Sequence, residues 1–413
     1  MRVEHIYGNI AVYFAPEFCA PAAPDESKRR GQVGLERRGW SRRHCGALLE
    51  HLKTRHLILD EPRRFGKSHL LDKIVATAPS GWIAHKFSVQ GHSSTVGLVT
   101  ALLAEVNQNR SVKGRLTTTV QKYITSAGVG PISLGVAFLQ NPLTTLWTAF
   151  SDVDRTLKQD AQFLLLAVDE ITEAIRAIGR TEGHQAAKDL LGVLRRMREE
   201  LSQVRWIMCG SIGFHHVLRE IGSTQNVLTI TKRAEMGPLS AEWAQYLATC
   251  LMMGLGHQPH DAQTQAIVEA LAENTDGIAM LIHMFAEHVK DNEIDSFSAE
   301  QVQGMLDECF VSSGQYANLT HLLARILDYY GGPGVGTSNE IAHAILDATS
   351  LTSAQPVSHT YLLSITSATS DDHRLVIDNL IADHYLVKTT SGTVRWRYPS
   401  LARVWRLRRG LSL

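Results

Sequence analysis

The 413-residue chain lacks the features that define several protein classes. Its five cysteines are widely spread and form no C-x-x-C pair, so neither a disulfide framework nor a structural zinc site is expected. No window reaches the roughly 18 to 20 consecutive apolar residues that cross a bilayer. The N-terminus has no basic segment followed by an apolar stretch, as a signal peptide would. We therefore predict a cytoplasmic protein without a membrane partner.

The chain also lacks net charge, because 41 Lys and Arg residues balance 41 Asp and Glu residues. This balance excludes a uniformly basic nucleic-acid coat protein and an acidic tail protein. It does not exclude local charged patches. Hydrophobic residues make up 44% of the chain and charged residues 20%, as in ordinary globular proteins. The length is too great for one compact core and predicts two or three domains.

Composition and periodicity divide the chain into four segments. Residues 1–45 are rich in Pro and Ala and then in Lys and Arg, which predicts a basic, loosely packed extension. Residues 46–237 alternate apolar strands with helices, which predicts an α/β domain with a parallel sheet. Residues 238–313 have only helical spacing and predict an all-α domain. Residues 314–413 combine helices with a two-strand hairpin signal, the pattern of a winged helix. The strands expected in the second segment are 56–59, 82–87, 163–168 and 204–209.

The segment Glu61–Ser68 (EPRRFGKS) lies between an expected strand and an expected helix, where a G-x-x-x-x-G-K-[ST] phosphate loop would lie. Gly66 allows the backbone to approach a phosphate, and the helix N-terminus favours anions. Lys67 supplies a charge for the β and γ phosphates, and Ser68 a hydroxyl for Mg²⁺. Glu61 replaces the first glycine of the pattern, so a chance G-K-S at a helix start is the alternative. The candidate nucleotide-binding residues are Pro62, Arg63, Arg64, Phe65, Gly66, Lys67, Ser68 and His69.

Two further candidates follow apolar strands. Asp169 and Glu170 end the run FLLLAV, and carboxylates there suit a metal ion and an attacking water. We assign Asp169 to the metal together with Ser68. Glu170 is the candidate general base, and Lys67 is the second catalytic candidate through its charge at the phosphates. Ser211 follows the strand 204–209 and is a candidate sensor that hydrogen-bonds the γ phosphate or the water. The alternatives are a solvated strand end for the acids and a turn residue for Ser211.

The segments P-R-R-F-G-K-S-x-L-L, L-L-L-A-V-D-E-I and C-G-S-I-G-F-H-H-V-L resemble the archaeal-type ATPase family of P-loop proteins, which belongs with the AAA+ and STAND nucleotide-switch ATPases. The resemblance covers the chain from about residue 46 to its end. It implies a P-loop NTPase fold of α/β class, with an AAA+-like parallel sheet flanked by helices, an all-α lid and a C-terminal winged-helix domain. It also implies ATP and Mg²⁺ as cofactors, and ATP hydrolysis coupled to conformational change. Ala279 departs from the Gly-x-Pro of related lids.

Several other residue types admit two interpretations. Any of five arginines could act on a neighbouring subunit's nucleotide, although each is better explained as a solvated helix residue. Adjacent His215 and His216 suggest a metal, but we favour packing. The basic and aromatic residues between 395 and 409 suit either a nucleic-acid backbone or a packed hairpin with a solvated basic face. The five arginines are Arg176, Arg180, Arg195, Arg196 and Arg233.

Three functions follow from these observations. The first is an ATP-hydrolysing switch that passes its nucleotide state to a protein partner, or to a second copy of the chain, through the winged helix. The second is a DNA-binding regulatory protein in which nucleotide controls only assembly. The third is a scaffold that has lost hydrolysis, which Glu61 suggests, although Lys67, Ser68, Asp169 and Glu170 are all present.

Overall fold

The computed structural model describes residues 48–59, 65–108, 141–312, 326, 328–330, 338–352, 355–366 and 369–411. Contacts divide the chain into two units. Residues 43–63 and 70–236 form the sheet unit, whereas residues 237–413 and the short stretch 64–69 form the helical unit. The predicted extension 1–45 lies outside the described residues.

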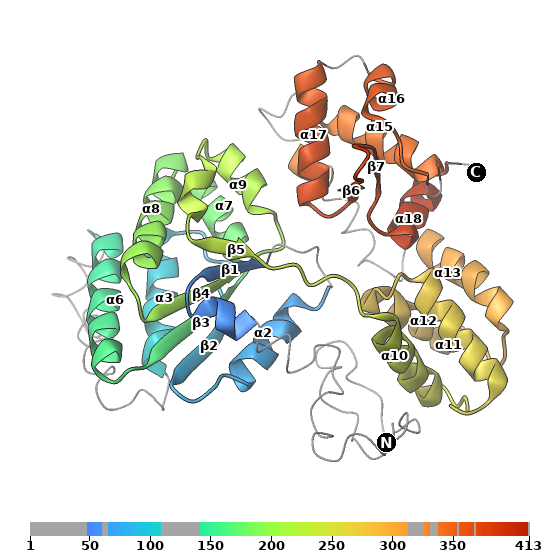
Figure 1. Cartoon of the computed structure of the whole chain (residues 1–413), viewed down its shortest axis with the longest axis horizontal. Helices are drawn as coiled ribbons and strands as arrows, with labels where there is room; N and C mark the ends of the chain where they lie inside the picture. The colour runs from blue at the N-terminus through green and yellow to red at the C-terminus, as the bar shows by residue number, and fades with distance from the viewer. Residues whose placement is uncertain are drawn as a thin grey trace. The chain divides into compact units, whose positions relative to one another are not determined.

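The sheet unit is built on five parallel strands in the order β2-β3-β4-β1-β5 (Figure 1). The first strand in the chain therefore lies between the fourth and the fifth. The strands are β1 (His56–Leu59), β2 (Trp82–Ser88), β3 (Phe163–Asp169), β4 (Val204–Cys209) and β5 (Thr231–Arg233).

Helices alternate with these strands. Helix α3 packs on β2 and on α6, while α6 also packs on β3 and α8, and α7 packs on α8 and α9. The elements are α2 (Lys67–Ala76), α3 (Thr95–Gln108), α6 (Pro142–Gln159), α7 (Ile171–Thr181), α8 (His184–Glu200), α9 (Phe214–Glu220) and the short 3₁₀ helix η3 (Gln225–Leu228). The alternation confirms the predicted α/β class.

Local sequence explains where the central elements form. Six of the seven residues of β3 are buried, as the continuous apolar run predicts for a strand covered on both faces. Helix α6 begins where Asn141 accepts a hydrogen bond from the Thr144 amide at 3.2 Å, and Pro142 occupies the first turn. All four strands expected from the sequence are present.

The parallel arrangement brings the carboxyl ends of all five strands to one edge of the sheet, which we call the carboxyl edge. Asp169 ends β3, and Gly210 follows β4 directly. The carboxyl end of β1 runs into the chain segment that carries the phosphate-loop sequence. In open α/β sheets, ligands bind outside this edge, so the candidate residues of the sheet unit lie where a ligand site is expected.

The helical unit contains helices and one short hairpin. The strands β6 and β7 pair antiparallel, and Val357 forms an isolated antiparallel bridge to Val394 in β7. The elements are α10 (Ala241–Gly254), α11 (Ala262–Asn274), α12 (Ala279–Asp291), η4 (Ala299–Gln301), α13 (Val302–Val311), α15 (Ser338–Leu351), α16 (His359–Ser364), α17 (Ser370–Ala382), β6 (Leu386–Lys388), β7 (Val394–Trp396) and α18 (Pro399–Arg409).

One hydrophobic cluster runs through this unit from α10 to α18. Helix α18 packs on both α13 and α15, and the indole of Trp405 donates to Asp347 at 2.7 Å. Trp396 in β7 donates from its indole to the Leu346 carbonyl at 3.3 Å. The division into two domains at residue 313 stays a prediction. Among the described residues, no helix is both long enough and apolar enough to cross a membrane.

Candidate functional site

Two acidic residues mark the point where β3 leaves the sheet. Asp169 is the last residue of β3 and is only 7% exposed, and its carbonyl accepts from the Val89 amide at 3.1 Å. Glu170 lies between β3 and α7, and its amide donates to the Asp169 carboxylate at 3.1 Å. The two acids that the sequence singled out therefore lie at the carboxyl edge with defined backbone positions.

Glu170 adopts a left-handed backbone conformation, with φ of 58° and ψ of 31°. Residues other than glycine rarely adopt this conformation, because the Cβ atom approaches the backbone closely. Such a conformation costs of order 1–3 kcal/mol and persists where surrounding contacts determine it, often at functional sites. The turn between β3 and α7 thus carries a glutamate in a backbone conformation that glutamate rarely adopts.

Ser211 lies next to Glu170 although the two residues are far apart in the sequence. The Ser211 hydroxyl donates to Oε2 of Glu170 at 2.7 Å, and the Ser211 amide donates to the same oxygen at 3.1 Å. Ser211 is only 4% exposed. The structure therefore brings together three of the predicted site residues, Asp169, Glu170 and Ser211.

Gly210, directly before Ser211, makes a close contact that the sequence does not predict. A Cβ atom built on Gly210 would lie 2.1 Å from Oγ1 of Thr172, which is fully buried in the first turn of α7. The Gly210 amide donates to the Leu59 carbonyl of β1 at 3.1 Å. Only glycine fits at position 210. A glycine directly after an apolar strand is the one sequence signal for this close approach.

The predicted phosphate-loop residues are described only in part. Pro62, Arg63 and Arg64, with Glu61 before them, lie outside the described residues. Phe65 is buried, and its ring centroid lies 5.6 Å from that of Tyr398 within the helical unit.

The remaining loop residues open a helix, as the motif requires. Gly66 has a φ of 87°, which suits glycine, and α2 begins at Lys67. Lys67 is only 6% exposed, whereas Ser68 and His69 are exposed on the first turn of α2. The proximity of Lys67 and Ser68 to Asp169 stays a prediction.

Four of the five arginines considered as trans-acting groups bond to acids of their own unit. Arg176 and Arg180 both contact Glu220, with N–O distances of 2.8 and 2.7 Å. Burial raises the pKa of Glu220, but hydrogen bonds from Arg180 and Arg176 and their charges outweigh it and lower this pKa. These contacts join α7 to α9. The other two pairs are Arg195 with Glu199 at 2.7 Å and Arg196 with Glu200 at 2.9 Å, both within α8.

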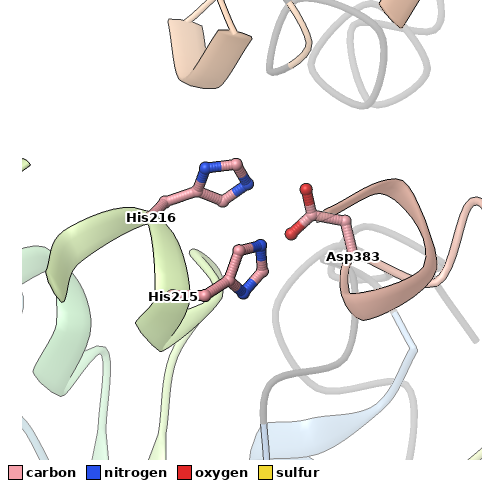
Figure 2. A group of neighbouring side chains, drawn as sticks. All are labelled: His215, His216 and Asp383. Carbon is pink, nitrogen blue, oxygen red and sulfur yellow. The ribbon is translucent and has the colours of Figure 1, made fainter. Parts of the chain in front are cut away.

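The adjacent histidines of α9 lie side by side. Their ring centroids are 4.1 Å apart (Figure 2), and Nδ1 of His216 lies 3.1 Å from Arg219. His216 is buried and His215 is half-buried, in agreement with the packing that we favoured. Asp383, also labelled in Figure 2, belongs to the helical unit, where it accepts from the Tyr330 hydroxyl at 2.7 Å.

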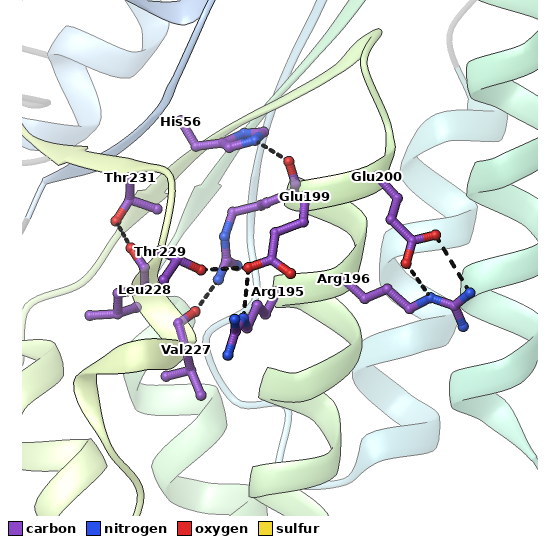
Figure 3. A network of polar contacts seen from close by, with 10 residues as sticks. His56, Arg195, Arg196, Glu199, Glu200, Val227, Leu228, Thr229 and Thr231 are labelled. Carbon is purple, nitrogen blue, oxygen red and sulfur yellow. Dashed lines mark hydrogen bonds and ion pairs between the residues drawn. The ribbon is translucent and has the colours of Figure 1, made fainter.

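A buried polar network lies at the opposite, amino edge of the sheet (Figure 3). His56, the first residue of β1, is 1% exposed. Its Nε2 lies 3.0 Å from the Arg198 carbonyl, and its Nδ1 accepts from the Trp206 amide at 3.2 Å. Burial lowers the pKa of His56 to about 4, more than the hydrogen bond to Arg198 raises it, and the Arg198 and Arg205 charges lower it further. His56 is therefore neutral at pH 7 and serves the stability of the sheet.

Comparisons with known proteins establish the fold. No protein-family model matches the chain, and no curated protein matches it. A Walker-type ATPase of Pyrococcus abyssi matches over 91% of this chain and 99% of its own, with 18% identity and a TM-score of 0.56. The ORC2 protein of Aeropyrum pernix, solved in ADPNP–ADP complexes, matches over 94% and 96% with 14% identity and a TM-score of 0.46. On the first of these likenesses, the chain shares the fold of this Walker-type ATPase, which confirms the predicted resemblance for the fold alone.

Proposed function

We propose that this protein binds and hydrolyses ATP at the carboxyl edge of its sheet. One observation carries the proposal. The sheet order places β4, with Ser211 bonded to Glu170, between β3 and β1, and β1 runs into the phosphate-loop sequence. In a parallel sheet of this order, a phosphate loop that follows β1 is expected at the same edge as the acids of β3. The Walker-type ATPase of Pyrococcus abyssi supports the assignment through its fold.

Each candidate residue has a role in this proposal. The backbone from Phe65 to His69 and the Lys67 ammonium bind the phosphates. Glu170 accepts a proton from water as the water oxygen bonds to the γ phosphorus and the bond to the ADP oxygen breaks. Pro62, Arg63 and Arg64 complete the loop. The general base and the phosphate-binding cation thus come from different strand ends.

The residues also suit a magnesium ion. Mg²⁺ prefers oxygen ligands, and Asp169 offers a buried carboxylate at the carboxyl edge, while Ser68 offers a hydroxyl on the first turn of α2. When bound, the ion neutralises charge on the phosphates. The Asp169 carbonyl accepts from the Val89 amide and its carboxylate from the Glu170 amide, and these contacts position the side chain that would hold the ion.

Calorimetry with ATP and Mg²⁺, followed by a phosphate-release assay, tests the proposal on the full chain. Lys67→Ala is expected to abolish measurable binding, because it removes the cation that faces the phosphates. Glu170→Gln is expected to bind ATP as the wild type does but to lose 10²–10⁴-fold in kcat, as when a general base is removed. Absence of ATP binding by the wild type would refute the proposal. Binding without turnover would favour the scaffold that has lost hydrolysis.

We further propose that residues 338–398 form a winged helix that passes the nucleotide state to a partner. The order helix, bridge at Val357, helix, helix and hairpin supports this assignment. In such modules the second helix of the helix-turn-helix is the one that meets DNA. That helix is α17.

The charges of the described residues favour a protein partner over DNA. Asp371, Asp372 and Asp378 are exposed on α17 against the single exposed cation Arg374. The basic residues beyond β7 are engaged inside the unit: Arg403 pairs with Asp307, and Arg409 pairs with Asp347 at 2.8 Å. An acidic helix repels phosphates, and paired arginines release few counterions.

The DNA-binding alternative is tested by fluorescence anisotropy with labelled duplex DNA at 50 and 200 mM salt. We do not expect DNA binding that weakens steeply as the salt concentration rises. Such a salt dependence arises when Lys and Arg side chains contact phosphates. A steep salt dependence that disappears when residues after 314 are removed would make the DNA-binding regulator the better proposal.

A further inference from the structure

The contact between Glu170 and Ser211 fixes one oxygen of the proposed base. The hydroxyl and the amide of Ser211 both donate to Oε2, at 2.7 and 3.1 Å. An orienting group that holds one end of an acid–base residue fixes its direction, as in catalytic triads. Neither bond uses Oε1. The serine therefore anchors the carboxylate through one oxygen.

The main chain around Ser211 is held from two sides. On one side, Gly210 lies so close to Thr172 that no Cβ atom fits between them. On the other side, the Gly210 amide donates to the Leu59 carbonyl at 3.1 Å. Since Thr172 is two residues after Glu170, the same packing that fixes Ser211 also fixes the turn that carries the glutamate. The two partners are thus positioned before any ligand binds.

The direction of the contact matters because of the strand order. Glu170 follows β3, and Ser211 follows β4, the neighbour that lies between β3 and β1. The bond therefore joins the Glu170 side chain to the neighbouring strand end, on the side of β3 on which β1 lies. A glutamate released from Ser211 would lose this direction.

We propose that Ser211 is a positioning residue that acts on ATP hydrolysis through Glu170, and not by its own contact with the γ phosphate. This inference rests on the proposed function. It differs from the sensor role expected from the sequence, in which the serine hydroxyl meets the phosphate or the water. The two roles predict different kinetics, because a positioning residue has no effect once the residue that it positions is gone.

A double-mutant cycle on the full chain separates these roles. Ser211→Ala is expected to lower kcat about tenfold or more, as small displacements of a reacting group do, with KM and the calorimetric affinity for ATP unchanged. Ser211→Thr, which keeps a hydroxyl, is expected to retain most of kcat. In a Glu170→Ala background, Ser211→Ala is expected to change single-turnover hydrolysis less than twofold. Ser202→Ala, an exposed serine before the start of β4, is the matched control and should behave as the wild type.

Each other outcome has a definite meaning. A weaker ATP affinity or a raised KM in Ser211→Ala, or a loss that persists in the Glu170→Ala background, would overturn the inference and favour a direct phosphate contact. Wild-type kcat in Ser211→Ala would overturn it while leaving the proposed function intact. If the wild type neither binds nor hydrolyses ATP, the proposed function fails, and the inference fails with it. Unchanged ATP affinity also shows that Ser211→Ala remains folded.

Discussion

Protonation of His56 is expected to destabilise the sheet unit. In the native state the Nε2 proton of the neutral ring is donated to the Arg198 carbonyl, and Nδ1 accepts from the Trp206 amide. A proton on Nδ1 would break the second bond and place a charge in a buried site near two arginines. The pKa of His56 is accordingly lowered from 6.5 to about 4.

The size and sign of this effect follow from linkage. The unfolded chain binds the proton near pH 6.5 and the folded chain only near pH 4, so the unfolded state holds more protons between these values. Stability is complete above pH 6.5 and falls as the pH drops toward 4. At about 1.4 kcal/mol per pKa unit, the difference corresponds to at most about 3 kcal/mol.

Hydrogen exchange of peptides from β1 and β4, corrected for the intrinsic rate, measures this effect within the sheet unit. His56→Asn retains an acceptor for the Trp206 amide but cannot gain the proton. We expect the stability difference between wild type and His56→Asn to shrink by up to about 3 kcal/mol from pH 7 to pH 4. His184→Asn, at an exposed position in α8, should show no such change. A difference that stays constant between pH 7 and pH 4 would refute the reasoning.

Two further perturbations test packing and charge in the same unit. Gly210→Ala should destabilise it by about 2 kcal/mol or more, since the new Cβ would lie 2.1 Å from Oγ1 of Thr172; Thr172→Ala should restore part of the loss in thermal melts, and Gly192→Ala, where nothing lies within 4 Å, should cost nothing. Glu220→Gln should cost about 1 kcal/mol at pH 7 by loss of two partly exposed ion pairs. Because the pKa of Glu220 is lowered, this difference should vanish as the pH falls through that lowered pKa, and a difference unchanged at pH 3 would exclude the pairs as its cause.

Three of the four strands that the sequence predicts, β1, β3 and β4, are almost wholly buried, whereas β2 is mostly half-buried. The residues of β3 and β4 are almost all buried and form continuous apolar runs, which propensity and pattern detect directly. Strand β5 has only three residues, Thr231–Arg233, none of them buried, and it lies at the edge of the sheet. Such a strand owes its existence to pairing with β1, a long-range contact that no local pattern encodes.

Two helices of the structure, α7 and α18, have clear signals in the sequence. Helix α7 repeats apolar residues at Ile171, Ala174, Ile175 and Ile178, which is helical spacing. In α18, Pro399 occupies the first turn, where proline is favoured. The basic residues of this segment suit either a nucleic-acid backbone or a packed hairpin in the sequence. The structure shows that the hairpin ends at β7 and that a helix follows.

The candidate site could be predicted in its residue types but not in its contacts. A carboxylate after one apolar strand and a serine after another both suggest the carboxyl edge of a parallel sheet. Their bond depends on the pairing of β3 with β4, in which Val168 lies opposite Met208. It also depends on the close approach of Gly210 to Thr172. Both are tertiary features, and the sequence alone reveals only that a glycine follows β4.

Residues at the amino edge of the sheet serve its stability, whereas residues at the carboxyl edge serve the proposed chemistry. This difference can be tested. At the amino edge, His56 is buried in a network whose hydrogen bonds are satisfied by the backbone of α8 and β4. At the carboxyl edge, Glu170 is held in a left-handed conformation and bonded to Ser211. His56→Asn should therefore change the stability of the unit while leaving kcat at a permissive temperature unchanged. Ser211→Ala should do the reverse, because it removes a bond that directs a carboxylate but leaves the packing of Gly210 against Thr172 in place. If both variants lowered stability and kcat in proportion, the contact at Glu170 would be one more stabilising interaction of the sheet, without a part in hydrolysis.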